Sequence, residues 1–150
     1  MHVVLVEPKI PQNTGNIGRL CVLTECQLHL VGQLGFSISD SYLRRAGLDY
    51  WRLLDVKQHV SLVELWEQVP QARFHYVSTK ADQLYTEVNY DQEDYLVFGS
   101  ETKGLPEKLI NDQQNFAIKI PMWGRKPRSH NLGNSVAIII YEALRQIKKF

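Results

Sequence analysis

The sequence lacks the features that mark several large classes of protein. Its 150 residues include only two cysteines and six prolines, and no apolar run approaches the ~20 residues that a membrane-spanning helix needs. Cys21 and Cys26 are too few for a zinc site or a disulfide scaffold, so we expect both to be buried free thiols. The net charge of +1 means that any nucleic-acid binding must depend on local patches rather than on the whole chain.

The composition is that of an ordinary globular domain. Hydrophobic residues make up 44% and charged residues 22% of the chain, which excludes a disordered or fibrous protein. The length predicts a single domain spanning residues 1–150. Residues 1–7 contain neither a basic leader nor a small-residue cleavage site, so we expect a cytoplasmic protein.

Strand and helix patterns alternate along the chain. Short apolar runs predict strands at residues 3–7, 27–31, 74–78, 95–98 and 116–120. Apolar residues at helical spacing predict a first helix capped by Asn13 or Thr14, a short one at 41–46, one at 61–68 capped by Ser61, and a last one from 134 to about 149. This alternation predicts an α/β fold with a mostly parallel sheet flanked by helices.

The last helix is apolar nearly all round its axis. One stripe is formed by Val136, Ile140, Ala143 and Ile147, and other directions are occupied by Ile138, Ile139 and Tyr141. A helix of this kind is buried on more than one side. It lies either wholly inside the monomer or between the core and a second subunit. We favour the dimer, because a domain of this size has few layers in which to bury a helix.

Three polar loops follow predicted strands, at residues 8–16, 98–106 and 121–134. In parallel sheets ligands bind beyond the carboxyl ends of the strands, so these loops are the candidate site. The glycines at 15 and 18 lack the spacing of a dinucleotide-binding motif. Gly99 and Gly104 have P-loop spacing, but Leu105 and Pro106 replace the required lysine and hydroxyl residue.

Other common chemistries have little support in the sequence. The five histidines show no ligand spacing, which predicts no metal site, and we expect His29 and His75 to be satisfied structural histidines. A hydrolase is weakly supported, because Ser129 and His130 are neighbours but no nucleophile-elbow motif is present.

Lysine and arginine side chains near the candidate loops are suited to bind the phosphate backbone of a nucleic acid. The alternative is that they form an ordinary solvent-exposed charged surface. These cations are Arg44, Arg45, Lys103, Arg125, Lys126, Arg128, Lys148 and Lys149.

Three motifs occur in order along nearly the whole chain. They are residues 11–19 (PQNTGNIGR), residues 98–106 (FGSETKGLP), and residues 120–122 (IPM) with 129–137 (SHNLGNSVA). In order and spacing they resemble the SpoU–TrmD (SPOUT) class of RNA methyltransferases. Residues 44–50 (RRAGLDY) are similar to the small single-domain branch, which methylates the ribose 2′-OH of the wobble nucleotide, cytidine or uridine 34, of tRNA.

The resemblance implies several properties at once. It implies a C-terminal trefoil knot, which general rules of chain topology do not predict. It also implies S-adenosylmethionine as methyl donor with no metal, the anticodon region of tRNA as partner, and a homodimer packed through the first and last helices.

The resemblance also implies site residues. The catalytic set is Asn13, Arg19, Glu101, Ser129 and Asn131, and the cofactor-binding set is Val77, Gly99, Ile120, Ser129 and His130. Glu101 is equally well explained as a helix-capping carboxylate. The family assigns activation of the hydroxyl to Arg19. Because a guanidinium stays protonated, we expect Arg19 to grip the phosphate beside the target ribose and align the 2′-OH.

The chain departs from the family pattern at a few positions. His130 stands where leucine or methionine is usual, Gly133 where serine is usual, and Gly18 where isoleucine is common. The alternatives to a tRNA methyltransferase are a non-catalytic RNA-binding relative, methylation of another RNA position, and a small-molecule nucleotide-binding enzyme.

Overall fold

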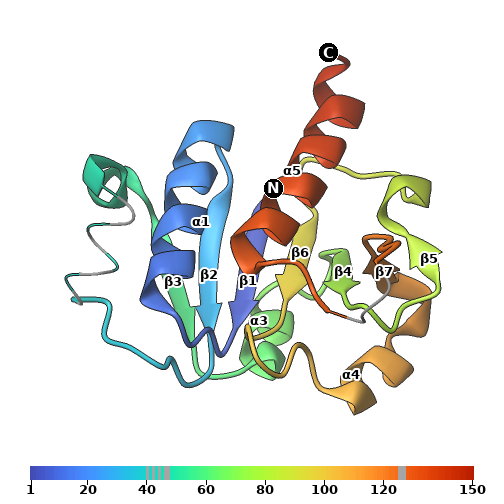
Figure 1. Cartoon of the computed structure of the whole chain (residues 1–150), viewed down its shortest axis with the longest axis horizontal. Coiled ribbons are helices and arrows are strands. Elements are labelled where there is room, and N and C mark those ends of the chain that lie inside the picture. Colours follow the sequence, from blue (N-terminus) through green and yellow to red (C-terminus); the bar gives the residue numbers. More distant parts are fainter. Residues whose placement is uncertain (40, 42, 44, 46–47, 125–127) are drawn as a thin grey trace.

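A computed structural model describes residues 1–39, 41, 43, 45, 48–124 and 128–150. Within these residues, seven strands form one sheet in the order β3-β2-β1-β6-β4-β7-β5, and every strand pair is parallel (Figure 1). The strands are β1 (His2–Val6), β2 (Gln27–Val31), β3 (Val56–His59), β4 (Phe74–Val77), β5 (Gln83–Leu84), β6 (Tyr95–Phe98) and β7 (Ala117–Lys119). The predicted α/β class with a parallel sheet is confirmed.

Helices cover both faces of this sheet. They are α1 (Pro11–Thr24), α3 (Leu62–Gln68), α4 (Glu107–Asp112) and α5 (Leu132–Lys148), with the 3-10 helices η1 (Leu48–Leu53), η2 (Tyr85–Glu87) and η3 (Gln114–Phe116). Helices α1 and α5 pack beside each other on one face, and side chains of α3 and α4 join the core on the other. No helix among the described residues is both long and apolar enough to cross a bilayer.

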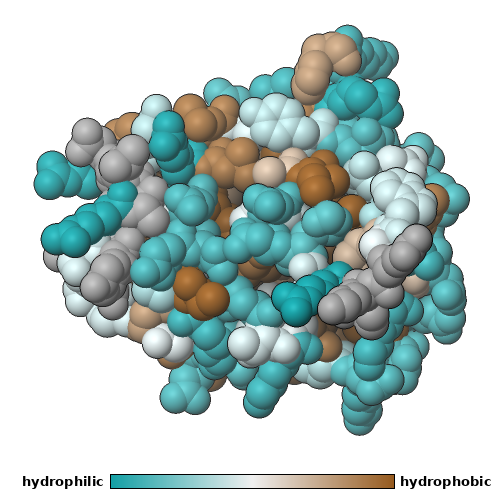
Figure 2. All heavy atoms as spheres, in the orientation of Figure 1, coloured by the Kyte–Doolittle hydropathy of each residue, from teal (hydrophilic) through white to brown (hydrophobic). Residues whose placement is uncertain are grey.

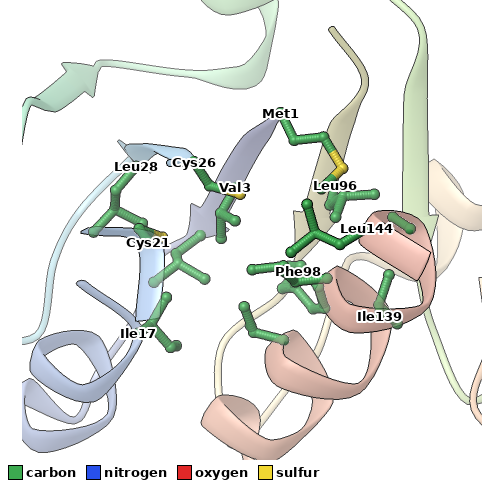
Figure 3. Close-up of a cluster of buried hydrophobic side chains, with 14 of the residues drawn as sticks. Met1, Val3, Ile17, Cys21, Cys26, Leu28, Leu96, Phe98, Ile139 and Leu144 are labelled. Atoms are coloured by element: carbon green, nitrogen blue, oxygen red, sulfur yellow. The ribbon is translucent and has the colours of Figure 1, made fainter. Parts of the chain in front are cut away.

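The central strands supply apolar side chains to two separate cores. Val3 and Leu5 of β1 pack with Ile17 of α1 and Ile139 of α5, whereas Val4 faces the cluster on the opposite side (Figure 3). Successive strand side chains point to opposite faces, and both faces are covered. This double burial explains why residues 3–6 of the first predicted strand form a continuous apolar run.

The start of α1 differs from the prediction. Pro11 occupies the first turn and Ile10 is the N-cap, without a side-chain cap hydrogen bond. Asn13 and Thr14 therefore lie inside the helix and are buried. Proline favours this start because its fixed φ suits a helix and its missing N–H would have had no partner there. The predicted cap at Ser61 is confirmed, since its hydroxyl accepts a hydrogen bond from the Glu64 backbone N–H.

Helix α5 begins two residues before the predicted start, because Asn131 caps it. Of the predicted apolar stripe, Val136, Ile140 and Ala143 are fully buried. Tyr141 is 51% exposed, so one side of the helix faces outward. The helix predicted at residues 41–46 falls partly outside the described residues.

The short elements β3, β5 and α4 were not expected from the sequence. Strand β3 reads Val-Lys-Gln-His, and two of its four residues are exposed. It lies at an edge of the sheet, where polar residues are common. The apolar run that marks a buried strand is therefore missing.

The two histidines expected to be structural do have hydrogen-bond partners. His75 pairs with the Asp94 carboxylate at 2.9 Å. His29 lies between His2 and His59, at N···N distances of 3.0 and 2.9 Å. Burial, reinforced by the two neighbouring imidazoles, lowers the pKa of His29 to about 3, so this ring is neutral at physiological pH.

Candidate active site

A cavity of about 440 Å³ opens beyond the carboxyl ends of β4 and β6. Val77 and Phe98 are register partners at the ends of these two strands, so the loops that follow leave the sheet side by side. Residues 77–80, 98–107, Ser129, His130, Leu132 and Ser135 line the cavity. Its size is within the range of about 300–1,000 Å³ that is typical of small-molecule sites.

The loop after β6 folds back tightly on itself. The Gly104 N–H donates to the Ser100 carbonyl oxygen at 2.9 Å, and Gly104 has a φ of +66°. A Cβ on Gly99 would lie 2.0 Å from the Gly104 carbonyl carbon and 2.1 Å from the Leu105 nitrogen. Only glycine at position 99 fits this turn, which forms one wall of the cavity.

A hydrogen-bond network joins the three predicted motifs. Glu101 accepts hydrogen bonds from the backbone N–H groups of Lys9 and Ile10, at 2.8 and 3.1 Å. It also accepts one from the Asn13 side-chain amide at 3.2 Å. Asn131 donates in turn to the Asn13 side-chain oxygen at 3.0 Å. The carboxylate therefore holds the loop that enters α1 and sets the orientation of the Asn13 amide.

Asn131 is also the N-cap residue of α5. Its side-chain oxygen accepts from the backbone N–H groups of Gly133 and Asn134, at 2.9 and 3.4 Å. The amide group thus caps the last helix with one atom and reaches α1 with the other. This geometry fixes the helix start, and with it Ser129 and His130, against the first cavity.

Arg19 lies apart from this network. Its guanidinium carbon is 5.2 Å from the centre of the Tyr50 ring, a cation–π arrangement. Arg19 is not among the residues that line the described cavities. Beside it on α1, a Cβ on Gly18 would be 2.8 Å from a ring carbon of Trp51. The missing side chain at Gly18 allows η1, which carries Tyr50 and Trp51, to pack closely on α1.

A second cavity, of about 510 Å³, adjoins the first. Ser129 and His130 line both cavities, so the segment that contains them is a shared wall. The other lining residues are Tyr85, Ile120, Pro121, Met122, Trp123, Gly124, Arg128 and Ile138. Trp123 is 88% exposed.

The structure brings most of the predicted site residues together. Of the cofactor-binding set, Val77, Gly99, Ser129 and His130 line the first cavity, and Ile120 lines the second. Of the catalytic set, Glu101 and Ser129 line the first cavity, and Asn13 and Asn131 hydrogen-bond beside it. Arg19 is the exception.

The expected basic residues are spread more widely than the prediction assumed. Lys103 lines the first cavity and Arg128 the second. Lys148 is at the far end of α5, about 24 Å from its start at a rise of ~1.5 Å per residue, and pairs with Glu25. Arg44, Arg125 and Lys126 lie outside the described residues.

Sequence reasoning missed several cavity residues. Thr79 and Lys80 follow β4 and line the first cavity, and the carboxyl-end rule could have found them. Tyr85 and Ile138 line the second cavity from η2 and α5, and no sequence signal links them. Among the described residues, no group of three or more side chains is placed to hold a metal ion.

The fold and the cavities define an α/β protein with two adjoining cavities where loops of a parallel sheet converge. The sequence matches the SpoU rRNA Methylase family over residues 1–141. The chain belongs to this family.

Similar proteins cover nearly the same length. The tRNA (cytidine(34)-2′-O)-methyltransferase of Yersinia pestis is 44% identical over 98% of this chain and 94% of its own. A solved structure described as "Structural insights into the 2-OH methylation of C/U34 on tRNA" has a TM-score of 0.94 and 40% identity, and covers 99% of this chain and 97% of that one.

The fold also extends to a more distant relative. The SpoU methyltransferase AviRb from Streptomyces viridochromogenes, solved with the cofactor AdoMet, has a TM-score of 0.88 at 23% identity. The match covers 99% of this chain and 58% of that one.

Proposed function

We propose that this protein transfers a methyl group from S-adenosylmethionine to the ribose 2′-OH of nucleotide 34, cytidine or uridine, in tRNA. The observation that carries the proposal is the convergence of three distant motifs on one cavity, held by the hydrogen bonds of Asn13, Glu101 and Asn131. Relatives that share over 40% of their residues with the chain along nearly its full length are named for this reaction.

The first cavity fits the methyl donor. Its glycine turn at Gly99 leaves room for close approach to the backbone, and the neighbouring Ser129 and Thr102 offer hydroxyl groups. Val77 and Leu132 supply apolar surface for a purine ring. When bound there, the cofactor supplies a methyl group made electrophilic by a sulfonium.

The remaining chemistry concerns the ribose hydroxyl. Methyl transfer would join this oxygen to the methyl carbon, leave the carbon–sulfur electron pair on a neutral thioether, and pass the hydroxyl proton to water. Ser129, in the cavity wall, orients the hydroxyl, and Asn131 acts through its bonds to Asn13 and to the start of α5, which hold this segment in place. Arg19 carries a fixed positive charge and grips the adjacent phosphate, which aligns the 2′-OH.

The proposal includes a homodimer. Leu23 of α1 is 57% exposed, Tyr141 of α5 is 51% exposed, and Phe150 just beyond α5 is 73% exposed. Hydrophobic side chains gather on the face of the molecule where α1 and α5 lie (Figure 2). Such a patch suits association with a second copy. Tyr141→Glu is expected to give monomers in light scattering, and a dimeric Tyr141→Glu variant would contradict this interface.

We also propose that the whole chain is one domain and that its C-terminal segment is knotted. Ser129, His130 and Leu132 line the same cavity as residues 98–107, and α5 then packs on α1, far along the sheet from β7. A tRNA substrate implies that the enzyme works in the cytoplasm.

The proposed activity is tested with purified protein, labelled S-adenosylmethionine and unmodified tRNA. We expect one methyl group per tRNA, found by mass spectrometry on the ribose of nucleotide 34. A tRNA with a 2′-deoxy nucleotide at position 34 is the matched control and should accept none. Tight tRNA binding without transfer would instead identify a non-catalytic RNA-binding relative.

The role of Arg19 is tested separately. Arg19→Ala is expected to abolish transfer and to leave the Kd for S-adenosylmethionine unchanged, because Arg19 lies outside the cavities. Loss of cofactor binding in this variant would contradict the assignment.

A further inference from the structure

The second cavity differs from the first because its wall is mainly aromatic and apolar. Its wall combines the rings of Tyr85 and Trp123 with the apolar side chains of Ile120, Met122 and Ile138. Trp123 is 88% exposed and Met122 40% exposed, so this surface is open to a ligand from solution. Adjacent exposed apolar and aromatic side chains that line a cavity mark a binding site more strongly than a single exposed residue does.

From this arrangement we propose that the second cavity binds the base of the nucleotide whose ribose is methylated, with the base stacked on Trp123. The inference rests on the proposed function. It assigns the first cavity to the methyl donor and the second to the RNA. On this assignment Ile120, which the family resemblance implies to be a cofactor contact, forms part of the wall of the base site.

The position of the cavity relative to the first one supports this assignment. Ser129 and His130 line both cavities, so only one segment of chain separates them. A ribose whose 2′-OH is directed at the methyl donor carries its base on the neighbouring carbon. A base held in the second cavity therefore keeps its ribose within reach of the first.

The charge and polarity of the wall also suit a nucleotide. Arg128 lies in the lining and supplies a cation for the phosphate that follows the base. Aromatic and apolar side chains form most of the remaining wall, and this is the surface on which bases stack without sequence preference. Such a pocket accepts a flat pyrimidine by shape, so cytidine and uridine should bind similarly.

The first test compares Trp123→Ala with Trp123→Phe in steady-state methylation of tRNA. Removal of the ring should raise the KM for tRNA by about tenfold, equivalent to ~1.4 kcal/mol of lost base stacking, and the phenylalanine should restore most of the affinity. The factor should be the same for tRNAs with cytidine and with uridine at position 34. The exposed Phe116 lies outside this cavity, so Phe116→Leu is the control and should leave the KM unchanged.

The second test uses tryptophan fluorescence, because a stacked base quenches an indole. The chain has three tryptophans, and Trp123 is the one that lines the described cavities. Titration with an anticodon stem–loop RNA should quench the wild-type protein, and Trp123→Phe should remove the quenched component. A parallel titration with free cytidine monophosphate separates a site for free nucleotides from a site for RNA. Equal affinity for the two ligands would contradict binding as part of the RNA.

Further outcomes would overturn the inference. A large rise in the Kd for S-adenosylmethionine in Trp123→Ala would assign the cavity to the cofactor. An unchanged KM for tRNA in an active Trp123→Ala enzyme would show that the ring does not contact the base. Failure of the wild-type protein to methylate any tRNA, with the quenching retained, would contradict the proposed function but not the base-binding cavity.

Discussion

The side chain of Asn131 donates a hydrogen bond to the side-chain oxygen of Asn13 at 3.0 Å, across 118 positions of sequence. The same Asn131 amide caps α5 through its oxygen, and the Asn13 amide donates to Glu101. Each amide uses its oxygen and its nitrogen for different partners. The three motifs are thus joined by bonds that need a donor and an acceptor on one side-chain group, which the asparagine amide supplies.

Substitution of Asn131 separates its two roles. Asn131→Ala should lower the free energy of unfolding by about 1 kcal/mol, because the helix cap is lost. Asn131→Asp keeps the cap acceptor but cannot donate to Asn13, so stability should be nearly retained. Both variants should bind S-adenosylmethionine more weakly, as measured by calorimetry alongside urea denaturation. Wild-type affinity in Asn131→Asp would show that the bond to Asn13 does not shape the cavity.

Gly99→Ala should prevent the turn that walls the first cavity. The added Cβ would meet backbone atoms of Gly104 and Leu105 at 2.0–2.1 Å, and backbone cannot move aside as a flexible side chain can. We expect at least a hundredfold loss of cofactor affinity, on the order of 3 kcal/mol, and a lower melting temperature. Gly133→Ala is a milder comparison, since its Cβ would lie 3.2 Å from a single side-chain oxygen. Equal effects of the two substitutions would contradict this explanation.

Gly18→Ala tests whether η1 positions Arg19. The new methyl group would lie 2.8 Å from a ring carbon of Trp51 and 2.9 Å from a methyl of Leu54. We expect the rigid indole to be pushed outward and to move η1, with Tyr50, away from Arg19. Because alanine favours a helix by up to ~1 kcal/mol over glycine, the clash should be partly offset in stability. We expect turnover to fall several-fold with unchanged cofactor affinity, as a lost cation–π contact of ~0.5–1 kcal/mol predicts.

The control for that experiment removes only the aromatic partner. Tyr50→Phe keeps a ring over the guanidinium and should retain turnover, whereas Tyr50→Leu should reproduce the loss seen in Gly18→Ala. Full turnover in Tyr50→Leu would mean that the ring does not position Arg19.

Asp94 should make stability depend on pH in the acid range. Its burial alone would raise the carboxyl pKa, but hydrogen bonds from His75 and Arg73 outweigh burial and lower the pKa to about 2. Because this is below the usual value of 3.8, the charged form stabilises the fold fully above about pH 4. That stability, on the order of 2 kcal/mol, is lost as the pH falls through 2.

Asp94→Asn removes this carboxylate at nearly constant shape. The free energy of unfolding at pH 7 should fall by about the same 2 kcal/mol, and its change between pH 4 and pH 2 should become smaller. Urea denaturation over a pH series measures both quantities. If the free energy of unfolding of the wild type and of Asp94→Asn changed equally between pH 4 and pH 2, another carboxyl group would be responsible for the loss of stability in acid.

Local sequence rules predicted the strands that are buried on both faces. Residues 3–6 of β1 and all of β6 are apolar without interruption, since α1 and α5 cover one side and α3 and α4 the other. The rules failed at β3, where edge position permits Lys57 and Gln58, and at the start of α1, which begins at Pro11 with Ile10 as its N-cap instead of Asn13 or Thr14. Edge pairing and the choice of a cap depend on neighbours that local pattern does not contain.

The amino-acid order alone determined the layered α/β class, the three polar loops and the family to which the chain belongs. Periodicity and motif spacing are properties of the chain itself, and they can be read without coordinates. Tertiary packing decided that Asn13 hydrogen-bonds to both Glu101 and Asn131. It also placed the Arg19 guanidinium over the Tyr50 ring and Trp123 in the wall of a second cavity. These relationships join residues up to 118 positions apart, and hydrogen bonds and ring contacts act only over a few ångströms, so only the folded chain creates them.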